Sequence, residues 1–210
     1  MPHQATCLNS IASTLLVLAL AFALLTGCST TRFSDMLPGS GTPELRSSLS
    51  GNSLPANLPT RIFAPSKIGV ADLYLTDLPE ELLRNGGDLS TYKGIIIHVH
   101  SFLRPRAGKT PIDPDATTAV TRVFVLTGDG NAGLYAGGGL FLTSDDPKAD
   151  TFEGSLRGAT LYLSRATAGF DDLLGPSRLA GLIAGKRDEV LAAQLATITQ
   201  TLAEAMDSVE

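Results

Sequence analysis

The sequence predicts a mainly β fold, either an antiparallel β-sandwich or a strongly twisted sheet of about six to eight strands, with an amphipathic helix at the C-terminus. Two observations lead to this prediction. Short runs of β-branched and aliphatic residues alternate with polar residues, which is the period-two pattern of strands that bury one face. Turn-forming residues separate these runs, and few of the intervals have room for a helix, which favours antiparallel neighbours.

The first predicted elements are a strand and a short helix. Apolar residues recur between positions 68 and 75 and indicate a strand, with an irregularity at Asp72. Asp77 follows this strand and is expected to cap a helix that ends near Arg84, because an aspartate side chain can accept hydrogen bonds from the first free N–H groups of a helix. An Asn-Gly-Gly sequence then ends the helix.

Positions 94–104 give the strongest strand signal in the chain. The run is rich in isoleucine and valine, which are enriched in strands. By the period of two, one face carries Ile95, Ile97 and Val99, and the other face carries Ile96, His98, His100 and Phe102.

Four further strands are expected, at positions 119–127, 134–143, 155–164 and 178–184. Within the second of these, Gly137-Gly138-Gly139 predicts a bulge or a close approach of two backbones. In the third, alternation assigns Leu156, Thr160 and Tyr162 to one face and Ala159, Leu161 and Leu163 to the other.

The last predicted element is a helix from about position 187 to 206. Its apolar residues recur at intervals of three and four and form one stripe, made of Leu191, Leu195, Ile198 and Leu202. Asp188 and Glu189 fall in its first turn, where the helix dipole favours negative charge. The stripe is expected to cover a face of the sheet.

The N-terminus carries a different kind of signal. An apolar run extends from Ile11 to Leu25, which is too short to cross a bilayer as a helix and suits the central part of a signal peptide. It ends in Leu25-Thr26-Gly27-Cys28, which resembles the lipobox of bacterial lipoproteins. One feature departs from the usual pattern: the first ten residues contain no Lys or Arg.

The resemblance implies that the chain is cut before Cys28 and that the Cys28 thiol carries a diacylglyceryl group. Residues 1–27 would then be the signal peptide, 28–60 the lipidated cysteine with a flexible linker, and 61–210 a single β-rich domain. The linker assignment rests on composition, because a stretch rich in Ser, Pro, Gly and Thr buries too little apolar surface to offset its conformational entropy. In Gram-negative lipoproteins the next residue sorts the product, and Ser29 implies the outer membrane.

Composition narrows the possible functions. The chain has a formal net charge of −5 and no cluster of Lys and Arg, which argues against nucleic acid as a partner. Its two cysteines are Cys7, in the predicted signal peptide, and Cys28, so the mature domain would have neither a disulfide nor a cysteine nucleophile. Five arginines lie on or beside predicted strands, where they either form an anion-binding surface or keep exposed faces soluble: Arg104, Arg106, Arg122, Arg157 and Arg165.

His98 and His100 are the residues in the sequence whose spacing most strongly suggests a chemical role. Two imidazoles on one face of a strand lie about 6–7 Å apart, a spacing that can chelate zinc when a third ligand arrives from elsewhere. Asp113 and Asp115 are the nearest following acids in the sequence. The alternative interpretation is that both histidines belong to a partly packed sheet face.

These observations predict a membrane-anchored envelope lipoprotein whose β-domain is a non-enzymatic protein-binding or scaffolding module, without a cofactor. Its expected partners are the membrane, through the lipid on Cys28, and another envelope protein. The alternative is a metal-binding protein or metal-dependent hydrolase centred on His98 and His100. A third, weaker hypothesis is a carrier of small molecules or lipids, with a pocket between the sheet and the stripe of the last helix.

Overall fold

The computed structural model describes residues 42–54, 58–65, 71–102, 117–143 and 150–209. The predicted signal peptide, Cys28 and the first part of the expected linker lie outside the described residues, as do Asp113 and Asp115. No helix within the described residues has both the length and the apolar character that crossing a membrane requires.

The predicted mainly β fold with a C-terminal helix is confirmed for the described residues. Eleven strands form one sheet, more than expected, because the sequence pattern did not reveal several short strands. The strands are β1 (Glu44–Ser47), β2 (Ser53–Leu54), β3 (Thr60–Pro65), β4 (Ala71–Thr76), β5 (Lys93–Ser101), β6 (Ala119–Thr127), β7 (Ala132–Gly139), β8 (Phe141–Thr143), β9 (Thr151–Ala166), β10 (Ser177–Arg187) and β11 (Asp207–Ser208); the helices are α2 (Glu80–Arg84) and α3 (Glu189–Glu204).

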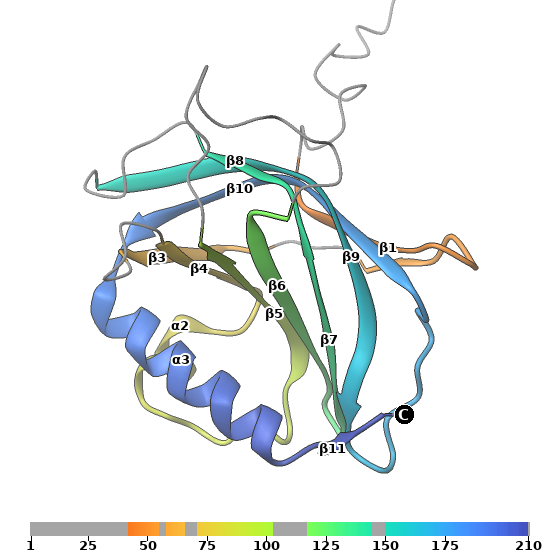
Figure 1. Ribbon diagram of the computed structural model, residues 1–210. Helices are drawn as coiled ribbons and strands as arrows, with labels where there is room; N and C mark the ends of the chain where they lie inside the picture. The colour runs from red at the N-terminus through yellow and green to blue at the C-terminus, as the bar shows by residue number, and fades with distance from the viewer. Residues whose placement is uncertain (1–41, 55–57, 66–70, 103–116, 144–149, 210) are drawn as a thin grey trace, which may run out of the picture. The chain divides into compact units, whose positions relative to one another are not determined.

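The sheet curves until its strands form a closed ring (Figure 1). Around the ring the order is β9, β7, β6, β5, β4, β3 and β10, and β10 pairs again with β9. Neighbours are antiparallel, as predicted, except that β10 runs parallel to β3 over a short contact. A closed sheet has an inner and an outer face, and the described chain buries a separate apolar cluster on each.

The inner face holds the larger core. Large side chains from most strands of the ring fill it, including Phe63, Leu73, Ile97, Val123, Tyr135, Phe152 and Leu161. On β5 the inward residues are Ile95, Ile97 and Val99, so the predicted alternation of this strand is confirmed.

Helix α3 covers part of the outer face, on the side of β3 and β4. The predicted stripe is confirmed: Leu191 and Leu195 are fully buried, and Ile198 and Leu202 pack against the same cluster. Asp188 caps the helix, since its side chain accepts a hydrogen bond from the Leu191 N–H at 2.9 Å. The helix rests on outward-facing residues of the ring, among them Ile62, Tyr74, Ile96 and Phe124.

Part of the predicted linker is folded. Residues 44–54 form the β1–β2 hairpin, and β1 pairs along its whole length with β10. Leu45 is 1% exposed and belongs to the inner core. The sequence did not predict this strand, because the polar composition of the segment favours disorder. Pairing with a distant strand can order such residues.

Two local predictions were wrong. Asp77 does not cap α2, whose N-cap is Pro79 and has no side-chain hydrogen bond; Asp77 instead accepts the Ile95 N–H at 2.7 Å. Leu156 does not share a face with Thr160 and Tyr162, but packs in the inner core with Ala159. A register shift in the β9–β10 ladder interrupts the alternation between these two residues.

Candidate functional site

The pairing of β4 with β5 brings both histidines to one carboxylate. Asp72 lies directly opposite His100, and Tyr74 lies directly opposite His98. All four side chains are on the outer face, because the residues between them point into the inner core. The two histidines thus lie on one side of β5, as the sequence predicts.

One oxygen of Asp72 contacts both imidazoles. Asp72 Oδ1 lies 2.9 Å from His98 Nε2 and 2.7 Å from His100 Nδ1. An ionised carboxylate can only accept hydrogen bonds, so the ring nitrogens that face it must carry their protons. This arrangement fixes the orientation of both rings, and we call these three residues the Asp72 cluster.

The cluster stabilises the charged form of its carboxylate. Partial burial acts to raise the pKa of Asp72, but the hydrogen bonds and positive charge of His98 and His100 outweigh it and hold the pKa below the usual 3.8. Burial and the nearby Asp72 charge raise the pKa of Tyr74, whereas Arg122 acts in the opposite direction. At neutral pH the site therefore contains an ionised carboxylate beside a neutral phenol.

Tyr74 supports His98 by stacking. The two rings are nearly parallel, at an angle of 4°, with centroids 4.5 Å apart. His98 is 8% exposed and Tyr74 is 3% exposed, so the stack is largely enclosed. His98 is therefore fixed by its carboxylate partner and by its aromatic neighbour.

A cavity of about 480 Å³ adjoins this stack, between α3 and the outer face of the ring. Tyr74 and His98 line it from the sheet, and Ala196, Thr199 and Gln200 line it from α3. Arg122, which lies opposite His98 on β6, completes the wall beside the histidine.

The cavity presents more positive than negative charge. Arg122 and Arg165 line it, against one acid, Glu204, which accepts a hydrogen bond from Gln200 at 2.8 Å. Arg165 donates to the Ala203 carbonyl at 2.8 Å. None of the ion pairs between described residues includes Arg122.

The arrangement differs from the predicted metal site. No group of three or more His, Cys, Asp or Glu side chains is placed to hold a metal ion in the part of the chain that the structure describes. In the Asp72 cluster the carboxylate itself occupies the space between the two imidazoles. A metal ion would have to displace Asp72 Oδ1 before it could bind both rings, so these residues do not fit a metal ion as they stand.

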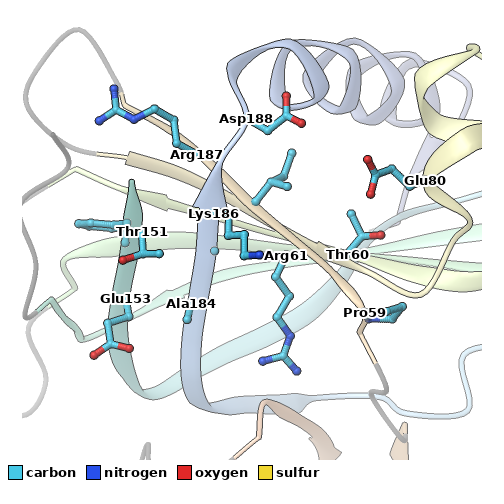
Figure 2. Close-up of a pocket in the computed structure, with 13 residues that line it drawn as sticks. Pro59, Thr60, Arg61, Glu80, Thr151, Glu153, Ala184, Lys186, Arg187 and Asp188 are labelled. Atoms are coloured by element: carbon cyan, nitrogen blue, oxygen red, sulfur yellow. The ribbon is translucent and has the colours of Figure 1, made fainter. Parts of the chain in front are cut away.

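A second cavity, of about 660 Å³, opens where β3 and β10 diverge (Figure 2). Arg61 and Lys186 extend into it from the two strands. Glu80 and Asp188 lie on its upper side, and Arg84 binds both of these acids, at 2.7 and 2.5 Å. Its lining contains three basic and three acidic residues, so it does not favour one sign of ligand charge.

A third cavity, of about 460 Å³, lies beside the C-terminal half of α3. Ile198 and Leu202 of the predicted stripe line it, together with Leu126 and Met206. Leu191 and Leu195 do not, because they close the core. Only two of the four stripe residues therefore line this cavity, as the carrier hypothesis requires of all four.

No protein family model, curated protein or solved structure matches the chain. Sequence reasoning found the histidine pair but missed Asp72 and Tyr74 as its partners. These lie 24 to 28 positions earlier in the chain, and only the β4–β5 register shows that they meet the histidines.

Proposed function

We propose that the protein is a lipid-anchored component of the bacterial envelope whose β-domain is a non-enzymatic binding module. The partner is another envelope protein, which places an acidic group in the cavity between α3 and the outer face of the ring. The observation that supports this most strongly is the position of Arg122, without an ion pair among the described residues, beside the rigid Tyr74–His98 stack.

The anchor rests on the lipobox, Leu25-Thr26-Gly27-Cys28, and Ser29 directs the product to the outer membrane, on its periplasmic side. Replacing Cys28 by Ser removes the only thiol at the expected cleavage site. We expect Cys28→Ser to abolish incorporation of radiolabelled fatty acid and to leave the precursor uncut. Cys7→Ser is the matched control and should change neither. Fatty acid that remains on the Cys28→Ser protein would rule out this anchor.

The binding role rests on how the site is built. The ring nitrogens of His98 and His100 that face Asp72 donate to its carboxylate, so they serve to hold a fixed surface. Arg122 then adds a charged donor that can bind a carboxylate in two-pronged geometry. A fixed surface beside a cation that has no ion pair among the described residues is suited to recognition, because little side-chain entropy is lost when the partner binds.

Cross-linking from the cavity tests this role. A photo-reactive residue in place of Ala196, which lines the cavity, should form a discrete adduct with one envelope protein in intact cells. The same residue at Ala193, which is exposed on the same helix but lines none of the cavities described above, should not. Arg122→Glu should reduce the adduct at least tenfold by repelling the partner's acid, whereas Lys93→Glu should leave it unchanged. An adduct that is insensitive to Arg122→Glu would contradict the proposal.

Metal binding at His98 and His100 is the second candidate. The observation in its favour is that the structure supplies a third group of a kind that zinc accepts, the Asp72 carboxylate. The observation against it is that this carboxylate is already bound to both imidazoles. The two candidate functions predict different metal contents for the purified protein.

A further inference from the structure

The opposite side of the ring carries an unusual arrangement of arginines. Arg46 of β1 and Arg178 of β10 are direct cross-strand partners, and both are exposed. Like charges in this position repel each other and destabilise a sheet. None of the ion pairs between described residues involves either arginine, and the acid nearest in register, Glu44, lies opposite Ala180.

A third arginine joins the pair through a bulge in β9. Arg178 donates from Nη2 to the Arg157 carbonyl at 3.2 Å. Its guanidinium lies across Gly158, where a Cβ atom would be 2.3 Å from Arg178 Nε, and Gly158 has a φ of +114°. The bulge therefore positions Arg178 beside exposed Arg157, and we call Arg46, Arg157 and Arg178 the arginine face.

Exposed apolar side chains lie at one end of this face. Leu49, in the β1–β2 turn, is 79% exposed, and Leu173, in the β9–β10 loop, is 70% exposed. The two turns are joined by a hydrogen bond from the Ser48 N–H to the Pro176 carbonyl at 2.7 Å. Tyr162 on β9 is also 58% exposed, and two exposed acids, Asp171 and Asp172, directly precede Leu173. Basic residues beside exposed leucine and tyrosine are typical of surfaces that contact a lipid interface.

The start of the described chain lies at the same face. Thr42, the first described residue, lies two positions before β1 and 14 positions after Cys28, and a chain of that length spans at most about 50 Å. A lipid on Cys28 would therefore keep the start of β1, beside the arginine face, within about 50 Å of the membrane, near enough for this face to reach the headgroups. In Figure 1, β1 lies across the ring from α3, so this orientation leaves the cavity that Arg122 lines facing away from the membrane.

We propose that the arginine face docks on the phosphate groups of anionic lipids in the membrane that holds the chain, with Leu49 and Leu173 entering the interface. This inference rests on the proposed lipid anchor. Each arginine near an anionic surface contributes enough attraction to raise the ratio of docked to undocked protein about fivefold. Docking would compensate the repulsion between Arg46 and Arg178 and would fix the orientation of an otherwise tethered domain.

The test uses the full-length protein with an environment-sensitive dye on Ser50→Cys, next to Leu49, reconstituted in vesicles. With 30% phosphatidylglycerol we expect a blue shift and quenching by brominated lipids, both lost at high salt. Phosphatidylcholine vesicles should give neither. Arg46→Gln should reduce the ratio of docked to undocked protein about fivefold, and its combination with Arg178→Gln about 25-fold. Lys93→Gln, which removes the same charge from β5, should have no effect.

The outcomes separate docking from anchoring. If the protein binds the vesicles but the dye stays in water, docking is overturned and the anchor is unaffected. A blue shift that the arginine variants do not change also overturns it. Mass spectrometry of the same sample shows independently whether Cys28 carries a lipid. If Cys28 carries no lipid, the proposed anchor is wrong. Docking is then tested by adding phosphatidylglycerol vesicles to the protein. If the dye shows no salt-sensitive blue shift with these vesicles, docking is overturned as well.

Discussion

Replacing Gly137 by Ala is expected to destabilise the fold by about 3–5 kcal/mol, the largest effect of a single methyl group in the described chain. A Cβ atom at this position would lie 1.8 Å from the Thr160 carbonyl oxygen of β9. The obstacle is backbone, so no side-chain rotation can relieve it, and β7 and β9 would have to separate.

Gly138→Ala is the matched control. Its Cβ would meet the end of the Thr117 side chain at 2.7 Å, and Thr117 is exposed and can move. We expect it to cost about 1 kcal/mol or less. Urea unfolding followed by far-UV circular dichroism measures both variants. Equal stabilities of the Gly137→Ala protein and the wild type would show that the two strands are not packed this closely.

The separation of β7 and β9 would also affect the proposed binding cavity. Ala136 of β7 and Ser164 of β9 both line it, so a shift between these strands changes its shape. Gly137→Ala should therefore weaken the cross-link from position 196 even under conditions in which the protein remains folded.

Asp72→Ala is expected to cost about 2–4 kcal/mol, the second large effect. The substitution removes a charged acceptor from two hydrogen bonds and leaves the largely enclosed His98 without that partner. Asp72→Asn keeps the shape and one acceptor oxygen and should cost roughly half as much. An Asp72→Ala protein as stable as the wild type would show that the Asp72 cluster does not stabilise the fold.

The same residue predicts how stability depends on pH. Hydrogen bonds hold the pKa of Asp72 below 3.8 in the folded protein, so the unfolded chain takes up the proton first. The stabilisation is therefore fully present above about pH 5 and is lost as the pH falls through the folded-state pKa. The difference in the free energy of unfolding between wild type and Asp72→Ala should narrow as the pH falls below about 4.

Patterns that depend on neighbouring residues were predictable from the sequence. The alternation of Ile95, Ile97 and Val99 with His98 and His100 fixed the faces of β5, because both faces follow from one uninterrupted strand. The stripe of α3 was predictable for the same reason. The Gly137–Gly139 run indicated a close backbone approach, which the contacts with β9 confirm.

Features that depend on distant pairing were not predictable. Asp72 meets the histidines only because β4 and β5 pair in one register, which local sequence does not reveal. Leu156 was assigned to the wrong face because the register shift beside it cannot be read from alternation. Leu45 lies in a short strand that is ordered by β10, more than 130 positions later.

In the proposed recognition surface, His98 lines the cavity, and the hydrogen bond to Asp72 and the stacking on Tyr74 hold its ring fixed. The most direct test is the metal content of the full-length protein, purified without chelator and measured by inductively coupled plasma mass spectrometry. We expect a stably folded protein without a stoichiometric transition metal. Near-stoichiometric zinc that is lost in both His98→Ala and Asp72→Ala would contradict it and would make these residues a metal centre.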